Sequence, residues 1–230
     1  MKQSRIFAGI FLFSFSSLAF EVVLTRIFSI SLWYHFAFMV ISIAMLGMGA
    51  SGTVLSLFPK LRNSSRIGLY GLLLGSSITV SYILSNRVPF DPVRLSWDRL
   101  QILYICIYYL LLSAPFFFFG LGVSTSLSVL SETSGLLYGS DLIGAGLGSV
   151  CILLFMDIMG PEHAVMLLSC TAYIGSIIIA GRKIRVVAAV LILLNFSLLM
   201  MPDIVRPRMS PYKALQLALQ YPGAEHLRTY

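Results

Sequence analysis

Residues 100–122 read LQILYICIYYLLLSAPFFFFGLG, a stretch without Asp, Glu, Lys or Arg. An α-helix rises about 1.5 Å per residue, so about 20 such residues cross the roughly 30 Å hydrocarbon core of a bilayer. Pro115 lies inside the stretch and should kink the helix, and neighbouring helices of a bundle can accommodate such a kink. The stretch therefore predicts a membrane-spanning helix.

The same criterion predicts spanning helices on both sides of this stretch. The composition agrees, because 58% of the 230 residues are hydrophobic and only 11% are charged, against about 25% charged residues in soluble domains. The mean hydropathy is +0.91. The predicted fold class is therefore all-α, a polytopic transmembrane helix bundle of about seven spans within residues 1–202. The further predicted spans are 6–30, 35–58, 66–85, 136–158, 163–181 and 185–201.

The positive charges lie in short clusters between these runs, which excludes the continuous basic stripe that nucleic-acid binding would need. Lys and Arg next to spans remain on the cytoplasmic side, so we predict a multi-pass protein of the bacterial inner membrane with a cytoplasmic N-terminus. The loop at 86–99 does not fit, since it places three Arg outside. A cleaved signal peptide is the alternative for residues 1–19, but apolar character resumes directly at Val22. The clusters are Lys2 and Arg5; Lys60, Arg62 and Arg66; and Arg182, Lys183 and Arg185.

Three ionisable residues inside the predicted spans are the candidate binding residues: Glu21, Arg26 and Asp141. Charged groups are costly in hydrocarbon, so each marks either a substrate site or a structural polar contact between helices. Glu21 and Arg26 are about 140° apart around a helix and are poor partners for each other. Asp141 should lie near the cytoplasmic interface, roughly 15 Å in depth from Glu21. The basic residues that match this depth are Arg5, Lys60 and Arg62.

Glycines form two clusters whose expected role is close helix packing, and Gly144 with Gly148 makes a GxxxG pair. The aromatic block 116–119 leaves a ligand cage and ordinary packing open, and packing is the commoner role. We find no nucleophile–base arrangement, phosphate-binding loop or His/Cys metal cluster, so no catalytic residue, metal or cofactor is predicted. The packing glycines are Gly47, Gly49 and Gly52 in the second run and Gly144 and Gly148 in the fifth.

Several stretches resemble the membrane region of spermidine-synthase-like, multi-spanning bacterial proteins. FEVVLTR at 20–26 is similar to the YEVVWTR element of their first helix, and LGMGASG at 46–52 resembles the glycine-rich end of their second. The most specific match is YGSDLIGAGLG at 138–148, which resembles the YaxDLxGAxLG segment of these proteins. SPYK at 210–213 and YPGA at 221–224 resemble the connection into their soluble part.

The resemblance implies a membrane bundle that precedes a Rossmann-like aminopropyltransferase domain, whose glycine-rich loop is absent from these 230 residues. Residues 203–230 are then expected to be a polar tail leading toward that domain. Seven spans with the N-terminus inside would place this tail outside, whereas a polyamine-making domain is expected in the cytoplasm. An extra half-helix or a miscounted span near 100–131 would remove the conflict.

The predicted function is a membrane-embedded module of a spermidine-synthase-like protein, for anchoring or substrate handling. Its expected partners are the lipid bilayer, a soluble transferase domain or protein and a polyamine-like small molecule. One alternative is a secondary transporter of the major-facilitator type, because the glycine-rich second run followed by Lys60 and Arg62 resembles a cytoplasmic loop of that superfamily. The loop lacks the usual acidic residue, however. A non-catalytic membrane scaffold is the other alternative.

Overall fold

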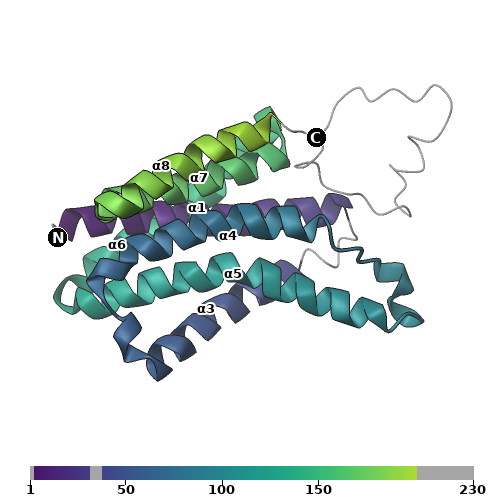
Figure 1. The fold of residues 1–230 in the computed structure, drawn as a ribbon, viewed down its shortest axis with the longest axis horizontal. Coiled ribbons are helices and arrows are strands. Elements are labelled where there is room, and N and C mark those ends of the chain that lie inside the picture. Colours follow the sequence, from purple (N-terminus) through teal and green to yellow (C-terminus); the bar gives the residue numbers. More distant parts are fainter. Residues whose placement is uncertain (1–2, 32–37, 201–230) are drawn as a thin grey trace.

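The computed structural model describes residues 3–31 and 38–200, and within these ranges it is a bundle of seven α-helices without a strand (Figure 1). The predicted all-α class is confirmed. The polar tail at 203–230, with its predicted connection motifs, lies outside the described residues. The helices are α1 (Gln3–Ser31), α3 (Met39–Leu57), α4 (Ile67–Ser85), α5 (Leu100–Val129), α6 (Ser134–Met159), α7 (Pro161–Ile179) and α8 (Arg182–Leu199).

Six helices of the described part are long and apolar enough to cross a membrane, namely α1 and α3 to α7. The helix α8, predicted as a further span at 185–201, is not among them. It has 18 residues, and Arg182, Lys183 and Arg185 occupy its first turn. The apolar part that remains is about 21 Å long, shorter than the hydrocarbon core. Even so, α8 lies along α7 in the bundle (Figure 1).

Prolines set two of the helix boundaries. α3 ends before Pro59, and α7 begins with Pro161, after Gly160 at a φ of 83°. Pro is favoured in the first turn of a helix because its missing N–H would have no partner there. Pro115 behaves differently, since α5 continues through it from Leu100 to Val129 as one helix. The segment 100–131 therefore contributes one crossing and no extra half-helix.

The helix α1 is the centre of the bundle. It packs against α6 on one side and α7 on the other, while α4 packs against both α5 and α7. The outer helices are α3, which packs mainly on α5, and α8, which packs mainly on α7. On α1, Ile10, Phe13, Phe20 and Leu24 are fully buried. The Phe13 ring lies against Gly71 of α4 and Gly175 of α7, where no larger residue would fit.

Gly144 and Gly148 bring α6 into backbone contact with α1. A Cβ atom at Gly144 would lie closer than 3.0 Å to the carbonyl oxygen of Phe11, and one at Gly148 would be equally close to that of Phe15. Because both pairs advance by four residues, α1 and α6 run in the same direction. Gly144 and Gly148, which were predicted to pack closely, thus make the closest backbone contact between α1 and another helix.

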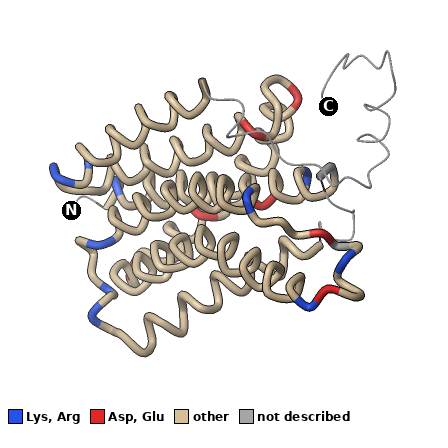
Figure 2. Tube along the Cα trace, turned by 45° about the vertical axis from the view of Figure 1, so that its right-hand side comes forward, with Lys and Arg blue, Asp and Glu red and all other residues tan. Residues whose placement is uncertain are grey.

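The two ends of the bundle carry different charge (Figure 2). Within the described residues, seven Lys and Arg and one acidic residue lie at the end where α1 begins, whereas the opposite end carries four Arg and four carboxylates. The first set is Arg5, Lys60, Arg62, Arg66, Arg182, Lys183, Arg185 and Glu132. The second set is Arg26, Arg87, Arg94, Arg99, Asp91, Asp98, Asp157 and Glu162.

The contact between α1 and α6 makes a direct prediction for stability. We expect Gly144→Ala to lower the free energy of unfolding by about 1–3 kcal/mol, because the new methyl group meets the rigid backbone of Phe11. Gly146→Ala is the matched control, since nothing lies within 4 Å of a Cβ atom at Gly146. Thermal unfolding in detergent, followed by circular dichroism, measures the difference. Equal melting temperatures for the two variants would contradict this packing.

Candidate functional site

Glu21 lies in the second half of α1, between Phe20 and Val22, and its side chain is half-buried. Its backbone carbonyl accepts a hydrogen bond from the Thr25 hydroxyl at 2.9 Å. Within the described residues, the Glu21 carboxylate has neither a hydrogen bond nor an ion pair. The structure therefore places, inside a candidate membrane span, a carboxylate to which the described residues offer no counter-charge.

Arg26 follows on α1 and is exposed. It forms no ion pair with Glu21, as the angle between them around the helix predicted. In the part of the chain that the structure describes, the one salt bridge joins Arg94 Nε to Asp91 Oδ2 at 3.2 Å in the loop between α4 and α5. The long Arg26 side chain stands at the end of the bundle that also carries Asp157, where it can reach toward the lipid headgroups.

Asp141 is held by a neutral partner. The Ser14 hydroxyl of α1 donates to Asp141 Oδ1 at 2.5 Å, and the same hydroxyl lies 2.8 Å from the Ile10 carbonyl oxygen. A hydroxyl has a single hydrogen, so these two acceptors share it. The depth-matched basic residues at 5, 60 and 62 make no ion pair with Asp141 within 4 Å in the described part of the chain.

Glu21 and Asp141 belong to two separate places along the bundle. The Asp141 carboxylate contacts the Ser14 hydroxyl, and Ser14 precedes Glu21 by seven residues on α1, so the two carboxylates lie about 10 Å apart in level. This separation is shorter than the roughly 15 Å predicted from the span boundaries. The two carboxylates are too far apart to contact each other, and a cation that moves along α1 would meet them in turn.

Polar contacts between buried side chains connect the helices, and pattern analysis did not find them. Ser16 of α1 and Thr171 of α7 are 2.5 Å apart, and the Thr79 hydroxyl of α4 donates to Asn195 of α8 at 3.1 Å. Each hydroxyl replaces a lost water contact inside an apolar environment. The only available signal was the presence of Ser, Thr and Asn within otherwise apolar runs, which does not name their partners.

The glycines of α3 differ from each other. A Cβ atom at Gly47 would lie closer than 3.0 Å to the Ser113 carbonyl oxygen and to Phe116 of α5. Gly49 and Gly52 are exposed, and nothing lies within 4 Å of a Cβ atom on either. The predicted packing role therefore does not apply to Gly49 and Gly52 within the described residues, because their side of α3 points away from α5.

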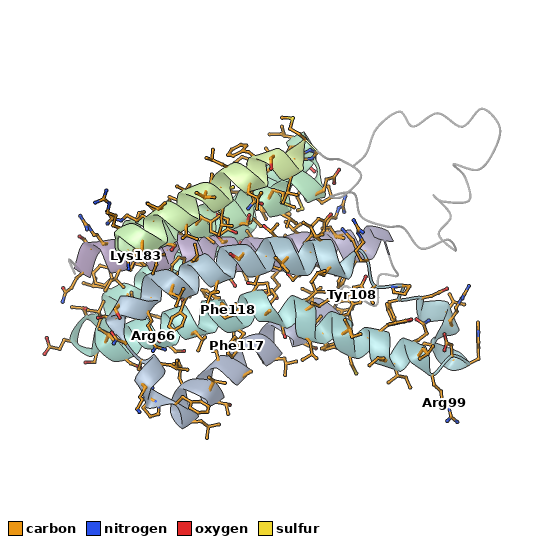
Figure 3. The ribbon with its side chains drawn as sticks, in the orientation of Figure 1. Arg66, Arg99, Tyr108, Phe117, Phe118 and Lys183 are labelled. Carbon is orange, nitrogen blue, oxygen red and sulfur yellow. The ribbon has the colours of Figure 1, made fainter. Side chains whose placement is uncertain are left out.

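The aromatic residues of α5 pack against other helices. Phe116 is buried, with its ring 5.9 Å from that of Phe20, and the Tyr108 ring lies 6.0 Å from Phe28. The rings of Phe117 and Phe118 are 5.5 Å apart, edge to face, further along α5 (Figure 3). For the aromatic block 116–119, these contacts agree with ordinary packing and not with a ligand cage.

The described residues contain no group of three or more His, Cys, Asp or Glu that could hold a metal ion. Comparison of the chain with protein-family models, with curated proteins and with solved structures finds no match. The candidate site therefore consists of this chain's own carboxylates, Glu21 and Asp141, on the two helices that make the tightest contact.

The hydrogen bond between Ser14 and Asp141 can be tested by a double-mutant cycle with Ser14→Ala and Asp141→Ala. We expect a coupling free energy of about 0.6 kcal/mol and at most about 1.7, the range of hydrogen bonds between membrane helices. Ser140→Ala is the control partner, because its hydroxyl bonds to its own helix at the Leu136 carbonyl. Unfolding in mixed detergent micelles gives the four free energies. Additive effects of Ser14→Ala and Asp141→Ala would contradict the hydrogen bond.

Proposed function

We propose that this chain is a multi-pass module of the bacterial inner membrane, akin to the membrane region of spermidine-synthase-like proteins, that anchors and handles a polyamine-like cation. A soluble transferase domain or protein is the partner that this proposal implies. The support from sequence is the resemblance at 20–26, 46–52 and 138–148, with Asp141 in the last of these.

The observation that carries the proposal is the Glu21 carboxylate without a counter-charge. A carboxylate in a span costs about 2.5–3.5 kcal/mol at the membrane centre, and it is normally paired or functional. Within the described residues the Glu21 side chain has no partner, so an entering ammonium group would supply the missing positive charge. Asp141 can act likewise, because its described partner Ser14 is neutral.

A secondary-transport activity is the second candidate, and the separation of the two carboxylates favours it. Glu21 and Asp141 lie about 10 Å apart in level along the same helix pair. Two acidic positions at different depths provide successive binding points for a cation that crosses the membrane. A bundle that only anchors a partner would not need the Glu21 carboxylate.

The charge asymmetry of the bundle supports a cytoplasmic N-terminus. Short loops rich in Lys and Arg remain in the cytoplasm, and the end where α1 begins has seven basic residues against one acidic residue. The loop 86–99, which did not fit the rule by its Arg content, has Asp91 and Asp98 beside its three Arg. Its positive charge is therefore largely compensated.

Amine handling predicts a carboxylate-dependent interaction with spermidine. We expect the chain in nanodiscs to bind spermidine, and Glu21→Gln to weaken this binding at least about tenfold, which corresponds to about 1.4 kcal/mol. The control Glu132→Gln removes the same charge at an exposed position in the short helix before α6 and should bind normally. Isothermal titration calorimetry measures the affinities.

Uptake of spermidine by proteoliposomes then distinguishes the two candidates. Uptake by the wild type that Glu21→Gln abolishes supports transport, and binding without uptake supports handling next to a transferase. If the wild type does not bind spermidine at all, the amine proposal fails and a structural scaffold remains.

The orientation predicts which loops accept a membrane-impermeant thiol reagent. In a background where the natural Cys106, Cys151 and Cys170 are replaced by Ser, we expect intact cells to label Ser96→Cys and to leave Ser65→Cys unlabelled. Both positions are exposed, in the loops at opposite ends of α4. Permeabilised cells should label both, which checks their reactivity. The reverse pattern in intact cells would place the N-terminus outside.

A further inference from the structure

The side of α1 that carries Glu21 is defined by three residues at intervals of seven. Ser14, Glu21 and Phe28 follow one another at this interval, and seven residues turn an α-helix by only about 20° less than two full turns. On this side Ser14 makes its hydrogen bond with Asp141 of α6, and the Phe28 ring lies 6.0 Å from that of Tyr108 of α5. Glu21 therefore lies between a contact with α6 and a contact with α5.

The Asp141 carboxylate lies along the same side of α1. Asp141 precedes Gly148 by seven residues, so it shares the side of α6 on which Gly148 meets Phe15 of α1. Its Oδ1 atom accepts the Ser14 hydroxyl hydrogen, and no described residue donates to its Oδ2 atom. The two carboxylates of Glu21 and Asp141 thus stand on one side of α1, about 10 Å apart in level.

Both carboxylates are accessible from this side. The Glu21 and Asp141 side chains are only half-buried. The two helices that flank Glu21 are not packed tightly on each other, because α6 packs mainly on α1 whereas α5 packs mainly on α3 and α4. A slender molecule that lies along this side of α1 can therefore contact both carboxylates.

The surface between the two carboxylates is apolar. Leu18 follows Ser14 by four residues and precedes Glu21 by three, so it lies between them on the same side of α1, and its side chain is half-buried. Along α1 the order is thus one negative charge, an apolar surface and a second negative charge. A linear diamine has the complementary order, because methylene groups separate its two ammonium groups.

The distance between the carboxylates determines which diamine fits. An extended alkyl chain advances about 1.25 Å per bond, so the two nitrogens of 1,8-diaminooctane are about 11 Å apart and those of 1,4-diaminobutane about 6 Å. The longer chain matches the separation of about 10 Å in level between Glu21 and Asp141. A cation with a single charge would neutralise one carboxylate and leave the other without a counter-charge.

We propose that Glu21 and Asp141 bind the two ammonium groups of one elongated linear diamine, whose methylene chain lies along α1 over Leu18. This inference rests on the proposed amine handling and adds to it the length of the cation and the simultaneous use of both carboxylates. Each ammonium group donates charge-assisted hydrogen bonds to its carboxylate. Once one end is bound, the other end is held at a high effective concentration beside the second carboxylate.

The test measures how affinity depends on the length and charge of the amine. Isothermal titration calorimetry compares 1,8-diaminooctane with 1,4-diaminobutane, which is too short, and with octylamine, which has the same chain but one ammonium group. The chain is embedded in nanodiscs of phosphatidylcholine, and empty nanodiscs give the contribution of the lipid. We expect 1,8-diaminooctane to bind at least about tenfold more tightly than either of the other amines.

Variants with one carboxylate should lose this preference. In Glu21→Gln and in Asp141→Asn, we expect the affinity ratio of 1,8-diaminooctane to octylamine to fall to about two, because two equivalent ammonium groups then share one carboxylate. Asp157→Asn is the control, since Asp157 is exposed and lies nine residues after Gly148, on the side of α6 away from α1. Glu21→Asp retains the charge and should keep the preference, which separates lost charge from lost folding.

The outcomes distinguish this inference from the proposed function. If 1,4-diaminobutane binds as tightly as 1,8-diaminooctane and Glu21→Gln weakens both, amine handling stands and simultaneous binding is wrong. An unchanged affinity ratio in Asp141→Asn, or an equal loss in the control Asp157→Asn, would overturn it as well. If none of the three amines binds to the wild type, amine handling itself fails, and simultaneous binding fails with it.

Discussion

The contact of Gly144 and Gly148 with the carbonyl groups of Phe11 and Phe15 is the interaction on which the arrangement of this bundle depends. In a bilayer, lipid chains are as apolar as leucine, so burial of apolar side chains gives little driving force for helix association. Close approach of backbones and polar contacts must supply it. The contact fixes α1 and α6 side by side in the same direction, and α1 then contacts α7 through its other side.

This central position of α1 explains why its polar residues differ in their surroundings. Ser14 and Ser16 are buried and connect α1 to α6 and α7. Glu21 lies beyond these contacts, half-buried, in the half of α1 nearer the balanced-charge end of the bundle. The bundle therefore stabilises the hydroxyl groups of α1 with its own helices, whereas within the described residues it offers no counter-charge to Glu21.

The distribution of charge at the two ends indicates the orientation of the bundle. The beginnings of α1, α4 and α8 share one end, so basic residues that are distant in sequence gather there. At the other end, Asp91 of the loop 86–99 pairs with Arg94, and Asp98 accepts a hydrogen bond from Gln101 of α5. The loops at one end are thus electropositive, whereas those at the other end are nearly neutral. A protein with a fixed direction in the membrane requires such a difference.

The sequence by itself determined the helical class, the approximate spans and the unusual positions of Glu21 and Asp141, because hydrocarbon admits only internally hydrogen-bonded backbone and makes charge costly. It could not distinguish Gly47, which packs against α5, from Gly49 and Gly52, which contact none of the described residues. That choice depends on the rotation of α3 against α5. Nor could it name Ser14 as the partner of Asp141, since the two residues are 127 positions apart and meet only when α1 and α6 are docked. Local composition decides which segments enter the membrane, and only helix packing decides which side chains meet there.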